Sequence, residues 1–384
     1  MKFLHLADLH LGKRVNEIPM LAEQENACRQ ILALAREEKP QAVLLAGDIY
    51  DKPTPAREAG QLFDWFLTEL AGIVPSVLII AGNHDGAERL AFAAQMLNRQ
   101  GVYIAPPFRG EVTRVELADE FGSVDFWLLP FVKPLLVRRC YDDAVDVADY
   151  DAAVARIMRE ICFRPGARNV LLAHQLITGS QTCESEELAI GGLDNVDAAR
   201  FAGFDYVALG HLHGAQRAGG MTKMRYAGSP LKYSFSEVRQ VKSVTLVELG
   251  ADGSVSIDTK PITPLHDMRE IRGTFATLTD PAYVSAQGEA AADYLHIVLT
   301  DAADVLDAAL RLNQVYPNLM KLDYDNARTR AEQTLFISAQ PEGKRPLQLF
   351  EEFYHAQTAQ ELTEEQRELI AGLIEEIWEE GDLA

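Results

Sequence analysis

The sequence predicts an α/β fold in three parts: a large α/β domain, a small α/β module and C-terminal helices. From Met1 to about Tyr206, short apolar runs alternate with helix-like segments, the usual pattern of an α/β domain. From about Leu265, strand-like segments enclose a helix-like one, and acidic helical segments follow "PEGKRP" at 341–346. With 384 residues, 48% of them hydrophobic, the chain can bury a sizeable core.

Three helices are expected in the large domain. They cover residues 20–39, closed by Pro40, residues 56–70, and residues 87–100, which stop at Gly101. No apolar run approaches the roughly 20 residues of a membrane helix, and the start, "MKFLHLADLH", is too polar for a signal peptide. We therefore expect a cytoplasmic protein that does not associate with membranes.

The cysteines and the charge distribution narrow the function classes. The cysteines lie far apart with no C-x-x-C pair, which argues against a zinc knuckle and favours buried reduced thiols at Cys28, Cys140, Cys162 and Cys183.

A net charge of −21 argues against a protein that binds nucleic acid by itself, although much of the excess negative charge lies in residues 346–384. The span 211–242 is basic and is either a DNA-facing wall or an ordinary solvated and packed segment.

Five apolar runs, each read as a strand, end in side chains that can bind a metal. The residues that follow these runs are Asp8 and His10, Asp48, Asn83 and His84, His174, and His211 and His213. Because the carboxyl ends of strands in α/β sheets meet at one edge, we expect these side chains to lie together. Each one alone has a simpler explanation as a turn former, a helix cap or a packed histidine, but their order and context favour a site.

Apart from His84, these residues offer two carboxylates, one amide oxygen and four imidazoles, which is too many donors for one ion. The mixture suits divalent ions of intermediate hardness such as manganese or iron, leaves zinc open and disfavours calcium. A pair of such ions, roughly 3.5–4 Å apart, acidifies water and stabilises in-line displacement at phosphorus. The predicted reaction class is phosphoester hydrolysis.

The motifs "DLH", "GD", "GNHD", "AHQ" and "GHLH", in this order, resemble those of the calcineurin-like metallophosphoesterase superfamily. The segments "DLHLGK", "GDIYDK", "YVALGHLH" and "YAGSPLKYSFSE" resemble the SbcD family within it, the bacterial counterpart of the double-strand-break repair nuclease. The resemblance implies a four-layer α/β/β/α metallophosphoesterase sandwich with a small α/β capping domain and C-terminal helices. "GDIYDKP" and "GNHD" differ from "GDxxDRG" and "GNHE" of protein phosphatases, which disfavours a Ser/Thr phosphatase.

The same resemblance implies a role for each site residue. One Mn²⁺ would be bound by Asp8, His10, Asp48 and His213, and Asp48 would bridge to a second bound by Asn83, His174 and His211. His84 would be catalytic and bind or protonate the leaving oxygen, since an imidazole can act as a general acid. The neighbouring Asp85 would either orient His84 or cap the helix that begins near Ala87.

The resemblance also implies a domain organisation. Residues 1–264 would form the nuclease domain, 265–340 the capping domain that helps position DNA, and 341–384 a linker and a helical partner-binding tail. The tail reads as two helices, the second opened by Thr363 and Gln366 in capping-box spacing and carrying an apolar stripe that includes Leu369 and Leu373. The stripe either folds back on the chain or, as the resemblance favours, docks on the coiled-coil base of an SbcC-type ATPase partner.

The predicted function is that of a DNA nuclease subunit in an SbcC–SbcD type complex, with a two-manganese site. The resemblance implies 3′–5′ exonuclease and endonuclease activity in DNA end processing, repair and recombination, and a homodimer within a heterotetramer. Two alternatives stay open: a phosphodiesterase for cyclic nucleotides or other small molecules, and a non-catalytic scaffold that binds DNA ends.

Overall fold

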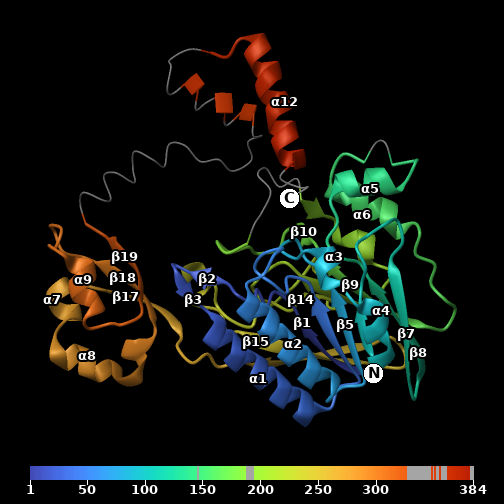
Figure 1. The fold of residues 1–384 in the computed structure, drawn as a ribbon, viewed down its shortest axis with the longest axis horizontal. Helices are drawn as coiled ribbons and strands as arrows, with labels where there is room; N and C mark the ends of the chain where they lie inside the picture. The colour runs from blue at the N-terminus through green and yellow to red at the C-terminus, as the bar shows by residue number, and fades with distance from the viewer. Residues whose placement is uncertain are drawn as a thin grey trace.

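Two six-stranded sheets pack face to face in the N-terminal part of the chain, with helices outside them (Figure 1). The computed structural model describes residues 1–144, 147–186, 194–326, 347–348, 350–351, 354–355 and 361–380. The strands of the first sheet, in spatial order, are β16 (Val255–Pro261), β15 (Ser243–Leu249), β1 (Lys2–Leu6), β4 (Ala42–Ala46), β5 (Ser76–Ile80) and β6 (Val102–Ile104). Those of the second are β13 (Gln216–Arg217), β14 (Met224–Tyr226), β12 (Tyr206–Gly210), β9 (Arg168–His174), β8 (Gly122–Leu128) and β7 (Thr113–Asp119).

The central strands of both sheets are mostly apolar because both of their faces are buried. Side chains alternate along a strand, so Leu44 of β4 joins the core between the sheets while Val43 and Leu45 join the core under the outer helices. In β9 the same alternation sends Leu172 to the core between the sheets and Leu171 to the opposite side. The strands β1, β4, β5 and β6 run parallel, as do β8, β9, β12 and β14.

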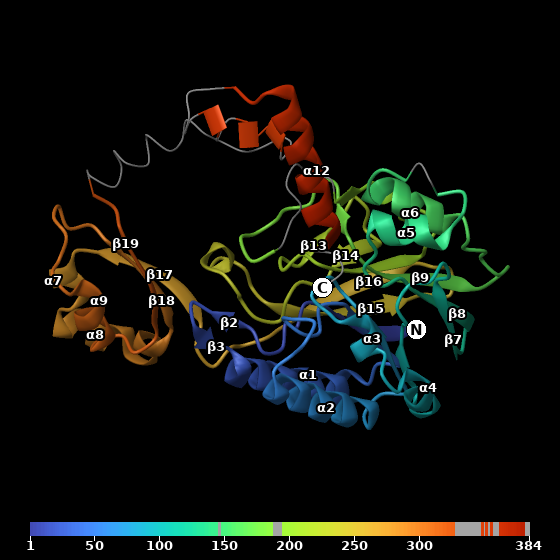
Figure 2. The same cartoon turned by 45° about the horizontal axis from the view of Figure 1, so that its top comes forward.

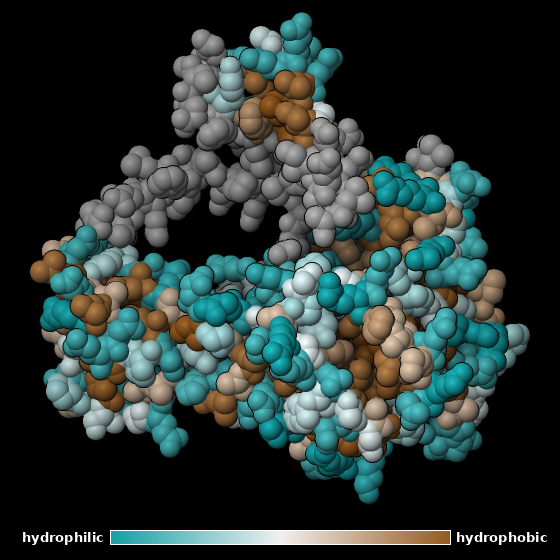
Figure 3. Space-filling model, viewed as in Figure 1, coloured by the Kyte–Doolittle hydropathy of each residue, from teal (hydrophilic) through white to brown (hydrophobic). Residues whose placement is uncertain are grey.

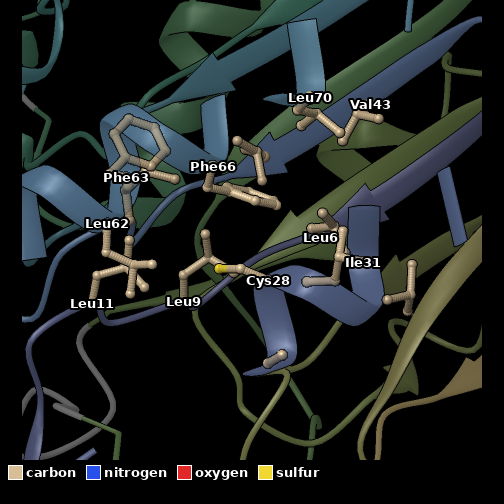
Figure 4. Close-up of a cluster of buried hydrophobic side chains, with 14 of the residues drawn as sticks. Leu6, Leu9, Leu11, Cys28, Ile31, Val43, Leu62, Phe63, Phe66 and Leu70 are labelled. Carbon is tan, nitrogen blue, oxygen red and sulfur yellow. The ribbon is translucent and has the colours of Figure 1, made fainter. Parts of the chain in front are cut away.

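The outer layers complete the four-layer α/β/β/α sandwich, and the predicted fold class is confirmed. The helices α1 (Leu21–Glu38) and α2 (Arg57–Ala71) cover the first sheet, and α5 (Pro134–Cys140) and α6 (Tyr150–Met158) cover the second. Figure 2 shows these helix pairs on opposite sides of the sheets. In Figure 4, side chains of α1, α2 and the first sheet meet in the core: Leu6, Cys28, Ile31, Val43, Phe66 and Leu70.

Two expectations about this domain are wrong. The helix expected over residues 87–100 is broken into α3 (Ala87–Leu90), α4 (Ala94–Leu97) and the 3-10 turn η1 (Asn98–Gln100). The break follows from the left-handed backbone of Ala93, at φ 61°, which a continuous helix cannot contain. All four cysteines are free thiols, but only Cys28 is buried, whereas Cys162 is exposed.

Short elements connect the sheets. They are the two-stranded sheets β2 (Arg14–Val15) with β3 (Ile18–Pro19) and β10 (Leu176–Ile177) with β11 (Asn195–Val196), and the 3-10 turns η2 (Ala198–Phe201) and η3 (Phe235–Glu237). The turn η3 lies in the "YAGSPLKYSFSE" segment and approaches the third sheet described next.

A third, three-stranded parallel sheet follows residue 264. It consists of β17 (Met268–Gly273), β18 (Tyr294–Leu299) and β19 (Leu319–Tyr324), connected by α7 (Phe275–Leu278), α8 (Pro281–Gln287), η4 (Gly288–Ala292) and α9 (Ala308–Asn313). Its own core includes Leu278, Ile297 and Leu312. The helices between β17 and β18 were not expected from the sequence.

One buried carboxylate holds the start of this third sheet against α1. Glu23 of α1 accepts hydrogen bonds from the backbone nitrogens of Leu265, at 2.7 Å, and His266, at 3.0 Å. It also contacts Nδ1 of His266, at 2.9 Å, and the hydroxyl of Tyr294, at 3.3 Å. Glu23 therefore helps to fix the third sheet against the sandwich, together with Met268 and Tyr294, which pack into the core of the first sheet.

The helix α12 (Glu364–Glu380) is described near the end of the chain, and its predicted capping box is present. Thr363 N donates to Gln366 Oε1, at 3.0 Å, and Gln366 N donates to Thr363 Oγ1, at 3.3 Å. Leu369 and Leu373 of the predicted stripe are exposed, and Figure 3 shows apolar atoms gathered on this helix. The expected linker at 341–346 and the side chains of Ile377 and Trp378 lie outside the described residues. No helix among the described residues is long and apolar enough to cross a membrane.

Candidate metal centre

The side chains expected at the strand ends converge at one place, where the two sheets meet. Asp8 follows β1, Asp48 follows β4, and Asn83 and His84 follow β5 in the first sheet. His174 ends β9, and His211 and His213 follow β12 in the second sheet. Apart from Asn83 and His84, which are half-buried, these residues are buried. The structure thus brings together all eight residues that the sequence singled out.

Asp8, His10, Asp48 and His213 form one side of the cluster. Nε2 of His10 lies 3.0 Å from Nε2 of His213 and 3.7 Å from Oδ2 of Asp48. Asp8, His10 and His213 each offer a donor atom within 4.8 Å of the others. Two imidazole nitrogens that face each other at this distance suit a shared cation, because only one of them can donate a proton to the other.

Asn83, His174 and His211 form the other side. Oδ1 of Asn83 lies 3.0 Å from Nε2 of His174 and 3.1 Å from Nδ1 of His211. Oδ2 of Asp48 lies 3.3 Å from Nε2 of His174. The Asp48 carboxylate therefore contacts residues of both sides, as a bridging group would.

His84 lies beside Asp48 and is held from two directions. Its backbone nitrogen donates to Oδ1 of Asp48, at 2.9 Å, and Nδ1 of its ring donates to the backbone carbonyl of Asp51, at 3.0 Å. Its Nε2, 4.0 Å from Oδ2 of Asp48, faces the cluster. The ring is therefore oriented by the backbone of Asp51.

Asp85 does not cap the helix that begins at Ala87, which was one of the two roles that the sequence suggested. Its carboxylate accepts hydrogen bonds from the backbone nitrogens of Gly82, Ile49 and Tyr50, at 2.9, 3.1 and 2.9 Å. It fastens the loop after β5 to the loop after β4, and no side chain caps the helix α3. Burial, with the negative charge of Asp48 nearby, raises the pKa of the Asp85 carboxyl to about 6.

The backbone at the site adopts conformations that ordinary residues avoid. Four candidate ligands have positive φ: Asp8 at 55°, His10 at 44°, Asp48 at 51° and His211 at 103°. Non-glycine residues in this region cost free energy and cluster at functional sites. The strands end abruptly here, and the side chains turn inward from both sheets.

Two glycines of the motifs are needed because other atoms of the site lie where a Cβ atom would be. A Cβ atom at Gly82 would lie 2.1 Å from Oδ1 of Asp48, and one at Gly210 would lie 1.9 Å from the carbonyl oxygen of Ala46. Gly82 is therefore more than a turn former, because it makes room for the Asp48 carboxylate. The same Ala46 carbonyl accepts a hydrogen bond from Nδ1 of His174, at 2.8 Å, which turns Nε2 of that ring into the site.

Several residues that support the site were missed in the sequence. Phe131 stacks on the His211 ring at 6.5 Å, and Tyr233 packs edge-on against His10 at 5.6 Å and His213 at 5.8 Å. Ser185 and Glu237 lie behind His213. The only signal for Tyr233 and Glu237 was their position in the "YAGSPLKYSFSE" segment, and nothing in the local sequence marked Ser185 or Phe131.

Burial and mutual charge shift the pKa values of the cluster in the metal-free protein. Burial, with the negative charge of Asp48 nearby, raises the pKa of Asp8 well above its usual range. Burial opposes the charged forms of both Asp48 and His174, but their attraction prevails, lowering the pKa of Asp48 and raising that of His174 to about 9. Burial and the positive charge of His174 lower the pKa of His211 to about 3.

The donor set fits divalent metal ions. Asp8 and Asp48 lie in a second group of possible ligands with His174, within 4.8 Å of one another. Within the described part of the chain, Oδ2 of Asp8 is buried and accepts no hydrogen bond, which is costly unless a cation neutralises it. The mixture of carboxylate, amide and imidazole donors suits ions such as Mn²⁺, Fe²⁺ or Zn²⁺.

The sequence profile of the calcineurin-like phosphoesterases matches residues 1–215, more than half of the chain. The chain belongs to this family. A second profile, described as the Type 5 capsule protein repressor C-terminal domain, matches residues 264–358. The SbcD subunit of the nuclease SbcCD from Staphylococcus epidermidis is 29% identical over 381 residues, covering 97% of this chain and 98% of that relative. These matches confirm the resemblance to the SbcD family.

Two solved structures of other proteins are also similar. One is GAP50, the anchor in the inner membrane complex of Plasmodium, at 12% identity and a TM-score of 0.39, covering 85% of this chain and 98% of that one. The other is a dimetal phosphatase from Danio rerio, at 12% identity and a TM-score of 0.41, covering 69% of this chain and 97% of that one.

The basic span 211–242 is mostly engaged inside the protein. Lys242 is buried against Glu237, and Lys232 donates to the carbonyl of Val238 and to Asp267. Lys223 donates to the carbonyls of residues 202 and 204. Of the two interpretations that the sequence left open, the structure favours a packed segment for these lysines.

Proposed function

We propose that the chain is the DNA nuclease subunit of an SbcC–SbcD type complex and hydrolyses DNA phosphodiester bonds with two Mn²⁺ ions. The convergence of eight side chains from five strands at one point carries the proposal. The likeness to the SbcD subunit of the nuclease SbcCD along 97% of the chain supports DNA as the substrate. Under the same proposal, the protein acts in the cytoplasm as an exonuclease and endonuclease that processes DNA ends.

The division of roles is the one that the family resemblance implies, and the contacts within the cluster support it. Asp8, His10, Asp48 and His213 would hold one ion, and Asp48, Asn83, His174 and His211 the other. Bound there, the ions polarise phosphoryl oxygens and lower the pKa of water at the site.

His84 is the one site residue whose ring is aimed at the cluster without being needed as a ligand. With Nδ1 committed to the Asp51 carbonyl, Nε2 can donate a proton to the oxygen that leaves phosphorus. The assignment of His84 as the general acid thus rests on which ring nitrogen faces the cluster.

Substrate assays separate this proposal from its alternatives. The purified protein is incubated with linear DNA, with cyclic nucleotides and with neither, in Mn²⁺ and in chelator. The proposal expects Mn²⁺-dependent release of nucleotides from DNA. Turnover of cyclic nucleotides alone would favour the small-molecule phosphodiesterase. DNA binding without cleavage in any metal would favour the scaffold.

We further propose that the apolar face of α12 binds the ATPase partner. Leu369 is 62% exposed and Leu373 is 40% exposed, although both are large apolar side chains on an acidic helix. Deleting the residues after Gln340 should abolish co-purification with an SbcC-type partner and preserve metal binding. Leu369→Glu should weaken co-purification, and Glu368→Gln, the neighbouring control, should not. Loss of folding in the deletion variant would contradict the docking proposal.

A homodimer is the remaining part of the proposed assembly. Phe92, between α3 and α4, and Met96, on α4, are 81% and 74% exposed, and Figure 3 shows an apolar patch over this region. Phe92→Asp should convert a dimer into a monomer in light scattering at micromolar concentration. A monomeric unaltered protein would contradict this part and leave the nuclease proposal standing.

A further inference from the structure

Both the backbone and the ring of His213 are held by hydrogen bonds from neighbouring residues. Its backbone nitrogen donates to Oε1 of Glu186, at 2.7 Å, and its carbonyl accepts from Nζ of Lys242, at 2.8 Å. Its ring nitrogen Nδ1 lies 2.8 Å from Oγ of Ser185. By contrast, within the described residues, Nδ1 of His10 has no hydrogen-bond partner.

The hydrogen bonds behind His213 run in one direction. Oγ of Ser185 lies 2.5 Å from Oε1 of Glu237, and a carboxylate can only accept, so the serine hydroxyl donates there. Its single proton is then committed, and the bond to His213 must be donated by the ring, from Nδ1–H to Oγ. In the neutral ring this leaves the lone pair on Nε2, the atom that faces His10 at 3.0 Å.

The end of this chain of hydrogen bonds is firmly fixed. The Glu237 side chain is fully buried and is paired through Oε2 with the buried Lys242 ammonium. Its Oε1 also accepts from the backbone nitrogen of Tyr233, at 3.2 Å. The Lys242 ammonium further contacts Oγ of Ser229, at 3.0 Å, and Oε1 of Gln240, at 2.7 Å. The carboxylate is therefore neutralised and held on the far side of Ser185 from the metal centre.

We propose that Ser185 and Glu237, supported by Lys242, are positioning residues that fix the ring orientation and tautomer of His213 for metal binding. Groups that accept the second N–H of a metal-binding histidine set which nitrogen is available, and their loss typically weakens metal binding 10–100-fold. Here the carboxylate acts chiefly through an intervening hydroxyl, because Oε1 of Glu237 lies 3.5 Å from Nδ1 of His213, beyond normal hydrogen-bond length. This inference rests on the proposed function, because it assumes that His213 binds an ion.

The chain offers a matched pair of serines for the test. Ser234 Oγ also contacts Oε1 of Glu237, at 3.3 Å, and its link to the His213 ring runs through that carboxylate. Ser185→Ala removes the hydroxyl that His213 needs, whereas Ser234→Ala removes a hydroxyl from the same carboxylate. In both variants Glu237 keeps Tyr233 N and Lys242, so both are expected to fold, which thermal melts would verify.

The experiment is a Mn²⁺ titration of the full chain, followed by calorimetry and by the electron paramagnetic resonance signal of free Mn²⁺. The unaltered protein should bind two ions. In Ser185→Ala, one dissociation constant should rise about 10–100-fold and the other should stay nearly unchanged. Ser185→Thr, which keeps a hydroxyl, should restore binding, and Ser234→Ala should bind both ions normally.

Two outcomes would overturn the inference and leave the nuclease proposal intact. One is unchanged binding of both ions by Ser185→Ala. The other is equal weakening in Ser185→Ala and Ser234→Ala, because the effect would then come from the carboxylate and not from the link to His213. If the unaltered protein binds fewer than two ions, the proposed two-metal function itself fails.

Discussion

Replacing His84 by alanine should remove a proton donor and preserve the metal centre. The hydrogen bond from His84 to Asp48 comes from the backbone nitrogen, so alanine keeps it. The imidazole itself is only 10% exposed and donates a hydrogen bond to the Asp51 carbonyl. Losing that bond should lower the free energy of unfolding by about 1 kcal/mol. The Mn²⁺ affinity should stay close to that of the unaltered protein.

The effect on catalysis should be much larger than the effect on stability. Loss of a general acid slows a reaction by about 10²–10⁴, which corresponds to about 3–5 kcal/mol in the activation free energy. This loss should appear with DNA, whose leaving oxygen needs a proton. It should fall below about tenfold with bis(4-nitrophenyl) phosphate, whose leaving group departs easily as an anion.

The assay compares kcat for both substrates in His84→Ala and in His355→Ala, a control that removes an exposed histidine near the C-terminus. Equal slowing on both substrates would refute the role of His84 as a proton donor, since the activated ester does not need one. An unchanged rate on DNA would refute any catalytic role. Loss of bound Mn²⁺ in His84→Ala would show that the residue belongs to the ligand set instead.

Three further predictions concern metal binding and stability. In the metal-free protein the pKa of His174 is about 9, and a metal ion binds only the neutral ring. The Mn²⁺ affinity measured by calorimetry should therefore rise about tenfold per pH unit from 7 to 9 and then level off. An affinity that does not change with pH would contradict this prediction. Asp119 forms ion pairs with Arg168 and with the Met1 amino group, the latter at 2.7 Å. Asp119→Asn should therefore lower the free energy of unfolding, measured by urea denaturation, by about 3 kcal/mol, and a loss under about 1 kcal/mol would contradict this prediction. Glu23→Ala should speed amide hydrogen exchange at residues 265 and 266, which donate to that carboxylate, and unchanged protection would show that other contacts hold the third sheet.

The strands and the site followed from the sequence because both depend on local patterns. An apolar run such as Ala42–Ala46 predicts a buried strand, and the topology of parallel sheets then places the nearby Asp48 at a shared edge. The five strand ends could therefore be assembled into one cluster without knowledge of any distance. The order of the strands in each sheet was not needed for that step.

The supporting residues could not be found in this way because their contacts join segments far apart in the chain. Ser185 and Glu237 are separated by 52 positions, and no periodicity relates them. The broken helix at Ala93 gave no sign, since alanine is a strong helix former and nothing in the local sequence predicts a left-handed backbone there. The sequence likewise left open whether the basic span faces DNA or is packed, because the contacts of Lys242 with Glu237 and of Lys232 with Asp267 appear only in the structure.

The central claim is that the side chains at the strand ends hold two divalent ions with Asp48 between them. Anomalous diffraction at the manganese edge, from crystals grown with Mn²⁺, tests it most directly. The account predicts two peaks, both next to the Asp48 carboxylate, one beside His10 and His213 and the other beside Asn83 and His174. A single peak, or two peaks of which one lies away from Asp48, would contradict it.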